Sequence, residues 1–264
     1  MRKRFDNYKF RCSDLGKIVS KSGKLTDGIK TYLQEIFIQE TEGVRKEISS
    51  KYFEKGLFEE ETGITLLQNT LHQKGLVLKN RERKSNDYIH GECDCFVKGT
   101  IYDIKNAWDR FTFGKAELTH NYEWQIRGYM ILWNADGGRL FYCLNNTPEH
   151  LLCEEERKLF YREHFVSFED KDYLSLCDEL RKAHNYDDKP LHERFKVWDV
   201  ELTAENIEQI EDSVIAARKY LNELAEEQQA SFEKNLRLMT AGLESKAFIA
   251  SQDNEVGAVI IDPL

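Results

Sequence analysis

The chain has 264 residues, of which 41% are hydrophobic and 32% are charged, and its mean hydropathy is −0.63. This composition supports one sizeable core and excludes a membrane-spanning protein, because no apolar stretch approaches the length that a bilayer requires. The formal net charge of −9 is uneven, since residues 1–55 carry 13 Lys and Arg against 8 Asp and Glu. An acidic protein with a local basic region can still bind nucleic acid.

The first half of the sequence is typical of helices. Residues 28–41 and 51–73 carry apolar side chains at helical spacing, and Glu60 lies inside the second segment. The apolar residues 76–78 predict a short strand, which a polar and partly basic loop follows over residues 79–87. We therefore expect two helices to precede the first strands.

Two strand candidates follow, at residues 91–97 and 100–107. The pair Lys98-Gly99 between them suits a tight hairpin turn. A helix is predicted over residues 121–134, and the pair Gly137-Gly138 then leads into another strand at residues 139–144.

A long helix is predicted to begin after Thr203, whose hydroxyl can cap it. Its apolar positions follow a 3-4 spacing: Ile207, Ile210, Val214, Ala217, Leu221 and Leu224. Two interpretations stay open, a helix packed on its own domain and a helix pair between subunits. We expect one domain over residues 1–200, with residues 201–264 as a C-terminal helix and tail packed on it or extending from it.

The six cysteines are scattered, and none forms the Cys-x-x-Cys pair of a zinc ribbon. We expect them to be buried, reduced thiols of a cytoplasmic protein. Basic residues stand at positions 2–4, but no apolar segment follows them, so a secretory signal is not expected.

The predicted hairpin carries the residues with the clearest chemistry. Side chains alternate between the two faces of a strand, so Asp103 and Lys105 share one face while Tyr102 and Ile104 share the other. Pairing of the two strands brings Asp94 close to Asp103. Two adjacent carboxylates repel each other unless one takes up a proton or a cation lies between them.

A hard divalent cation resolves this repulsion, and Mg²⁺ or Mn²⁺ suits carboxylate ligands together with water and a phosphate oxygen. Asp94 and Asp103 are the first candidate ligands, the backbone carbonyl of Ile104 is another, and Glu60 can complete the site or help to hold a second ion. Lys105 can then orient or deprotonate an attacking water, or offset charge on a phosphate.

The helix at residues 121–134 places Gln125 and Tyr129 on one face, because they are four residues apart. Gln125 is a candidate for contact with the scissile phosphate or a metal-bound water. Tyr129 can support it and is a candidate for contact with DNA, or it can be an ordinary core tyrosine whose hydroxyl is hydrogen-bonded.

These motifs in this order resemble the PD-(D/E)xK nuclease superfamily, and more narrowly its phage lambda-type exonucleases, also called YqaJ-like viral recombinases. The matching pieces are Gly56-xxx-Glu60, Gly91-x-x-Asp94, Asp103-Ile104-Lys105 and Gln125-xxx-Tyr129. Two departures stand out: Asp103 replaces a common Glu, and Glu92-Cys93 precedes Asp94 where Ser-Pro or Thr-Pro is commoner. Glu92 can assist a metal or remain solvated.

The resemblance implies an α/β (α+β) fold with a restriction-endonuclease-like core, in which helices flank a central mixed β-sheet and a C-terminal helix extends it. It further implies an exonuclease that digests linear duplex DNA from the 5′ end and leaves 3′ single strands for phage-type recombination. Arg11 and Ser13 match the family's opening motif, which handles the DNA end. A single-strand annealing protein as partner, a homo-oligomer such as a trimer, and a phage or prophage origin in the bacterial cytoplasm belong to the same expectation.

Other candidates follow from the residues alone. The basic side chains before the hairpin can grip phosphates or form a solvated loop: Lys79, Arg81, Arg83 and Lys84. Trp108, Phe111 and Phe113 can wedge at a duplex end, stack on a base, or pack under a loop. An endonuclease or structure-specific nuclease of the same superfamily, and a DNA-binding protein without catalysis, remain the alternatives.

Overall fold

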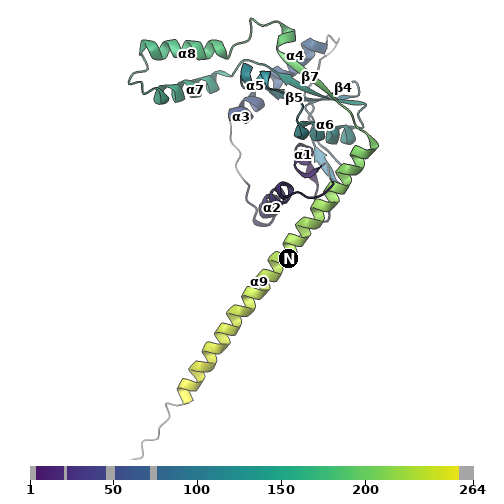
Figure 1. The fold of residues 1–264 in the computed structure, drawn as a ribbon, viewed down its shortest axis with the longest axis vertical. Helices are drawn as coiled ribbons and strands as arrows, with labels where there is room; N and C mark the ends of the chain where they lie inside the picture. The colour runs from purple at the N-terminus through teal and green to yellow at the C-terminus, as the bar shows by residue number, and fades with distance from the viewer. Residues whose placement is uncertain (1–3, 21–22, 46–50, 72–75, 256–264) are drawn as a thin grey trace, which may run out of the picture.

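The computed structural model describes residues 4–20, 23–45, 51–71 and 76–255 of the chain. It has a central four-stranded sheet with helices on both faces, a small three-stranded sheet beside it, and a long C-terminal helix that leaves the body (Figure 1). Within this described part, no helix combines the length and the apolar character needed to cross a bilayer. The mixed α/β architecture expected from the sequence is therefore present.

The central sheet has the strand order β4 (Cys95–Val97), β5 (Thr100–Asn106), β6 (Gly137–Cys143), β7 (Phe195–Val200). Strands β5 and β6 run parallel, while β4 and β7 are antiparallel to their neighbours. The β4–β5 hairpin turns at Lys98 and Gly99, whose φ angles of 49° and 81° are both positive, as a tight hairpin requires. The predicted hairpin and its turn are confirmed.

The second sheet has the order β1 (Phe10–Arg11), β3 (Ile89–Gly91), β2 (Lys84–Ser85). The strand predicted at residues 91–97 is thus divided, because β3 ends at Gly91 and β4 begins at Cys95. The carbonyls between them bond to Asn80, which donates from its amide nitrogen to Asp94 (2.7 Å) and from its side chain to Cys93 (3.1 Å). These bonds take the place of a continuous ladder.

Helices cover the two faces of the central sheet. Helices α1 (Leu15–Ile18), α2 (Asp27–Glu42) and α6 (His120–Trp133) pack on one side and share a core with Ile101 and Leu140. Helix α4 (Glu60–Leu71) packs on the other, where Tyr102 and Ile104 are buried. Strand β5 therefore alternates as predicted, and it turns Asp103 towards the α6 side.

Two predicted elements differ in the structure. The helix expected over residues 51–73 is divided into α3 (Lys51–Phe58) and α4, with a turn at Glu59, and its predicted end at Gln73 lies outside the described residues. Residues 76–78 are irregular and not a strand, and Leu76 and Leu78 are 80% and 70% exposed. Only Val77 is buried there, so this segment gains too little from burial to form a paired strand.

The remaining short elements lie around the sheet. Helix α5 (Arg110–Gly114) follows β5, and two 3₁₀ turns occupy Cys12–Asp14 and Leu191–Glu193. Helices α7 (Glu149–Arg162) and α8 (Lys171–Ala183) form an arm with its own small apolar cluster (Figure 1).

Helix α9 (Ala204–Glu255) begins where predicted, and the Thr203 hydroxyl accepts a hydrogen bond from the Asn206 amide at 3.3 Å. Ile210, Val214 and Leu221 are buried in the main core, against α1 and α2. This part of the apolar seam packs on its own body, so the helix-pair interpretation is wrong for it. From residue 226 to 240 the side chains are exposed, and the division of the chain at residue 200 stays a prediction.

Candidate active site

Strand β5 presents an acid and a base on the face that meets α6. Asp103 is completely buried, and the Lys105 ammonium lies 2.8 Å from its Oδ2 atom. Burial lowers the pKa of Lys105, but the carboxylates of Asp103 and Asp94 outweigh burial and raise the pKa above its ordinary value. Lys105 therefore carries its positive charge in this arrangement.

Asp94 is the residue before β4, and the hairpin register continues it towards Asp103. Its Oδ2 atom accepts a hydrogen bond of 2.6 Å from the amide of Ile104. Burial, followed by the charge of Asp103, raises the pKa of the Asp94 carboxyl to about 7. The expected carboxylate pair is thus assembled, and it favours a bound cation over two free negative charges.

Helix α6 supplies the next layer of the site. The Gln125 side-chain amide donates to Asp103 Oδ1 at 2.9 Å and to the Tyr129 hydroxyl at 3.1 Å. Burial, and then the charge of Asp103, raise the pKa of Tyr129, so its hydroxyl stays protonated. Tyr129 is 6% exposed and its hydroxyl accepts from Gln125, so it supports Gln125, and its contact with DNA stays a prediction.

The arrangement around Asp103 fits a cation. Among the described residues, the Lys105 ammonium at 2.8 Å is the polar contact of the buried Asp103 Oδ2 atom, which leaves this oxygen with spare capacity to accept. A carboxylate oxygen has more than one lone pair, so Asp103 Oδ2 can bind a metal ion beside Lys105. The carboxylate oxygens of this pair suit Mg²⁺ or Mn²⁺.

Glu60 is the first residue of α4, and its charge contributes to the raised pKa of Asp94. Its carboxylate bonds to the Lys79 ammonium at 2.6 Å. Among the described residues, no three His, Cys, Asp or Glu side chains are grouped closely enough to hold a metal. The structure thus brings Asp94 and Asp103 together as a pair, while Glu60 and the carbonyl of Ile104 stay predicted ligands.

A small hollow lies beside this site, at the junction of β1 and β3. It measures about 300 Å³ and is lined by Arg11, Cys12, Ser13, Arg83, His90, Gly91, Glu92 and Tyr129. An Arg83 guanidinium nitrogen lies 2.8 Å from His90 Nδ1. Burial, and then the charges of Arg83 and Arg11, lower the pKa of His90, so the ring is neutral beside two guanidinium groups.

The predicted basic loop is divided in space. Arg81 is exposed, and Lys84 lies over the Trp133 ring at 5.2 Å and 3.7 Å from a Glu82 oxygen. Only Arg83 of these three lines the hollow. Glu92 is an exposed residue at the rim of the same hollow.

The aromatic residues that follow β5 differ in exposure. Trp108 and Phe113 are buried, which is the packing alternative, whereas Phe111 is 80% exposed. Phe111 and Tyr122 line a second hollow next to the site, since the Lys105 ammonium lies 5.4 Å from the Tyr122 ring. Phe111 is the one of the three that remains available for a base or a duplex end.

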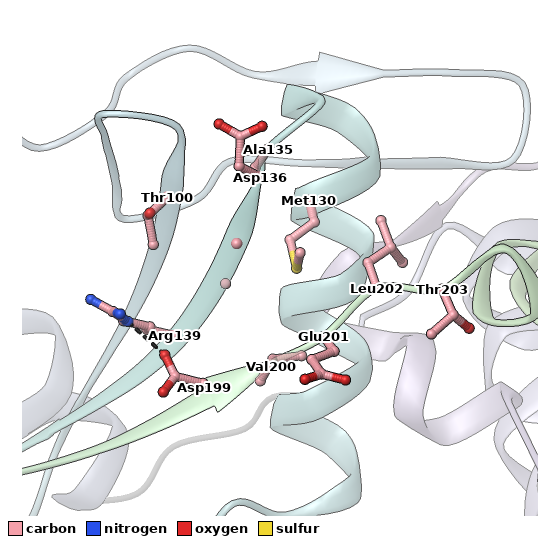
Figure 2. A pocket seen from close by; sticks show the side chains of 12 residues that line it. Thr100, Met130, Ala135, Asp136, Arg139, Asp199, Val200, Glu201, Leu202 and Thr203 are labelled. Atoms are coloured by element: carbon pink, nitrogen blue, oxygen red, sulfur yellow. Dashed lines mark hydrogen bonds and ion pairs between the residues drawn. The ribbon is translucent and has the colours of Figure 1, made fainter.

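A third hollow, at the start of β5, is polar but separate from these residues (Figure 2). Thr100, Asp136 and Glu201 line it, and an ion pair of 2.7 Å joins Arg139 to Asp199 at its wall. None of the predicted site residues contributes to it, so it is not the candidate active site. The six cysteines are free, and all but Cys153 are buried.

Sequence reasoning assigned no role to two sets of residues near the site. His90 is not spaced from other histidines or cysteines as a metal ligand would be, and no sequence pattern indicates its contact with Arg83. Lys55 and Asn145 are completely buried, yet a lone lysine in an amphipathic helix ordinarily indicates an exposed position. Their partners are far away in the sequence, so no local pattern shows them.

Similarity to known proteins is found by comparison of structures and not by comparison with family profiles or curated sequences. No protein-family profile matches the sequence, and no curated protein matches it either. An alkaline exonuclease from Laribacter hongkongensis has a similar structure (TM-score 0.55, 12% identity), with 87% of this chain and 95% of that chain covered. Its complex with dAMP gives a TM-score of 0.53 at 14% identity, over 86% of this chain and 94% of that chain. These two likenesses show a shared fold.

A phage-related exonuclease from Haemophilus somnus 129PT is more similar. Its crystal structure superposes with a TM-score of 0.64 at 29% identity, over 84% of this chain and 97% of that chain. The structural neighbours are thus exonucleases, and this chain has their nuclease fold. The resemblance drawn from the sequence motifs is confirmed at the level of these structural neighbours, and their shared fold accounts for the arrangement of β5, α4 and α6.

Proposed function

We propose that this protein is a metal-dependent exonuclease acting on linear duplex DNA. The observation that carries the proposal is the pair formed by the buried Asp103 and the half-buried Asp94, with the charged Lys105 at its edge. Two negatively charged carboxylates held close together in a partly buried site repel each other, and a bound divalent cation neutralises this repulsion.

Asp94 and Asp103 would hold one or two Mg²⁺ or Mn²⁺ ions, with Glu60 and the Ile104 carbonyl as further ligands. When bound, such a cation activates water and polarises the scissile phosphate. The raised pKa of Lys105 favours an ammonium that offsets charge on the phosphate, and disfavours a general base. Gln125 orients the Asp103 carboxylate through its 2.9 Å hydrogen bond.

The hollow lined by Arg11, Ser13, Arg83 and His90 supports digestion from a 5′ end. Two guanidinium groups, a hydroxyl and a small volume suit a terminal phosphate, which accepts several hydrogen bonds at once. A related alkaline exonuclease is known in complex with dAMP, which supports DNA as the substrate class. Digestion from this end leaves a 3′ single strand, and a single-strand annealing protein would be its consumer.

The wider setting follows from the family. A phage-related relative supports a phage or prophage origin, with the bacterial cytoplasm as the place of action. A homo-oligomer such as a trimer would keep the enzyme on its substrate between successive cuts.

The test is digestion of linear and closed circular duplex DNA with and without Mg²⁺. We expect loss of linear DNA only with metal, intact circles, and no cleavage by Asp103→Ala or Lys105→Ala. Cleavage of circles would identify an endonuclease or structure-specific nuclease. Wild-type protein without cleavage and without calorimetric Mg²⁺ binding would indicate a non-catalytic DNA-binding protein, and cleavage retained in both variants would reject the site.

The 5′-end part of the proposal has its own test. Linear duplexes with and without a 5′ phosphate are digested by wild type and by Arg11→Ala and Arg83→Ala. Both variants should lose the preference for the phosphorylated end, because each removes a guanidinium from the hollow. Arg139→Ala, at the remote hollow, is the matched control. A preference kept by both variants would move the phosphate site elsewhere.

A further inference from the structure

Lys55 in α3 is a completely buried charged residue outside the carboxylate site. Its ammonium donates to the carbonyls of Trp108 and Asn145, each at 2.9 Å, and to the Thr147 hydroxyl at 2.8 Å. An ammonium has three donors, so each is used. Because Trp108 follows β5 and Asn145 follows β6, one side chain ties α3 to both loops.

A second set of bonds continues from this point to the start of α4. The Asn145 side-chain amide donates to Asn106 Oδ1 at 2.8 Å, and the Asn106 amide donates to the Glu59 carbonyl at 3.3 Å. Asn106 follows Lys105 at the end of β5, and Glu59 directly precedes Glu60. The network therefore joins the end of the catalytic strand to the turn between α3 and α4.

Close packing fixes the same junction from the other side. A Cβ atom added to Gly63 would lie 2.7 Å from Ile104 Cγ2, so α4 approaches β5 as closely as a glycine allows. Gly63 and Glu60 are three residues apart and share a face of α4. The start of α4 is thus held at one particular position relative to Asp94 and Asp103.

Burial of the Lys55 ammonium carries a desolvation cost that its neighbouring charges only partly offset. Burial lowers the pKa of Lys55 to about 8, and the charges of Glu59 and Asp109 only partly oppose this effect. Its three acceptors are neutral oxygens, and His184 Nδ1 lies 2.9 Å from the Thr147 hydroxyl that completes the set. A charged group kept at such a cost is more typical of a functional region than of an ordinary helix face.

We propose that Lys55 is a positioning residue of the metal site, which holds Glu60 at the edge of the Asp94–Asp103 pair through the Asn145–Asn106–Glu59 network. The inference rests on the proposed function, since it assigns Glu60 to the cation. Lys55 touches neither substrate nor metal, and it acts through the position of α4.

The experiment is a double-mutant cycle in which the measured quantity is the dependence of cleavage on Mg²⁺ concentration. Lys55→Met keeps the length and burial of the side chain and removes its three donors. We expect the Mg²⁺ concentration for half-maximal cleavage to rise about tenfold, the lower end of what loss of an outer-shell partner costs in metal affinity. Glu60→Gln should shift it in the same direction. The double variant should show little more than Glu60→Gln alone, because the two residues act as a unit.

Calorimetric Mg²⁺ binding without DNA gives the same comparison independently of cleavage. Leu221→Ala is the matched control, since Leu221 is as deeply buried but packs against α1 and α2. It should lower the melting temperature without changing Mg²⁺ dependence. If Lys55→Met fails to fold, Asn106→Ala severs the network without leaving a cavity around a buried charge, and it should shift Mg²⁺ dependence in the same direction.

The outcomes separate the two proposals. Unchanged Mg²⁺ dependence in folded Lys55→Met or Asn106→Ala, or strictly additive effects with Glu60→Gln, would overturn the positioning role while the nuclease stands. Wild-type protein that binds no Mg²⁺ would overturn the proposed function first.

Discussion

At the scale of residues, the proposed chemistry depends on two carboxylates and one ammonium group that lie close together in a partly buried site. Burial and then the charge of Asp103 raise the pKa of Asp94, while the carboxylates of Asp103 and Asp94 raise the pKa of Lys105 against the effect of burial. Such groups store a cost in the metal-free protein that a ligand removes. Their titration therefore gives measurable consequences even without DNA.

Asp94→Asn should stabilise the metal-free protein at neutral pH. The folded pKa of Asp94 is raised to about 7 from an ordinary value of 3.8, so stability falls as pH rises between these values and is constant above them. Asparagine keeps an acceptor for the Ile104 amide and carries no charge. The gain in melting temperature should be larger at pH 8 than at pH 4.5, measured with EDTA; an equal loss at both values would contradict the assigned cost.

Gln125 and Tyr129 should contribute unequally to cleavage. Gln125→Ala removes the donor to Asp103 Oδ1, and we expect a fall in kcat of about a hundredfold, as for loss of a well-placed donor. Tyr129→Phe removes only the second acceptor of Gln125, so a fall below about tenfold is expected. Steady-state digestion at saturating Mg²⁺ compares them. Equal losses would mean that the Tyr129 hydroxyl has a direct role.

The site residues could be predicted to the extent that strand and helix periodicity places them. Alternation along β5 predicted the shared face of Asp103 and Lys105, and the spacing of four predicted the Gln125–Tyr129 pair. The bond between Lys79 and Glu60 could not be predicted in the same way, nor could the burial of Lys55. These contacts depend on how α3 and α4 dock on the sheet, which no local pattern encodes.

At the scale of elements, the position of α4 against β5 is the most sensitive contact. The sequence indicated one helix over residues 51–73, because apolar spacing continues through Glu59. The structure ends α3 at Phe58 and begins α4 at Glu60, so each helix can meet a different part of the sheet. Tertiary packing overrides a weak local preference here, as it does for residues 76–78.

Two glycines in these helices should respond oppositely to alanine. Gly63→Ala should destabilise the fold by about 1–3 kcal/mol, because the new methyl group meets Ile104. A Cβ atom on Gly56 in α3 meets nothing within 4 Å, so Gly56→Ala should stabilise by about 0.5–1 kcal/mol through helix propensity. Urea unfolding measures both. Destabilisation by both variants would show that α3 does not tolerate any change.

At the scale of the whole molecule, α9 has two halves with different surroundings. Val214, Ala217 and Leu221 are completely buried in the core, whereas residues 226–240 are exposed. The 3-4 spacing predicted a buried seam correctly, but it could not show where along the helix the body ends.

Truncation after residue 230 should therefore leave the melting temperature within about 2 °C of the full chain, because a ΔΔG near zero leaves the midpoint unchanged. Leu221→Ala should cost about 2–5 kcal/mol by leaving a cavity between α9 and its neighbours. Differential scanning calorimetry compares the two. A large loss on truncation would mean that the outer half of α9 is covered in solution.

The projecting helix also changes how the protein moves through a solvent. At about 1.5 Å per residue, the 52 residues of α9 extend roughly 78 Å, longer than a compact protein of 31.1 kDa is wide. Friction scales with this reach, so a single copy will leave a sizing column early, at the elution volume of a heavier sphere. Light scattering or sedimentation equilibrium, which weigh particles without regard to their outline, is therefore the way to count the copies in a particle.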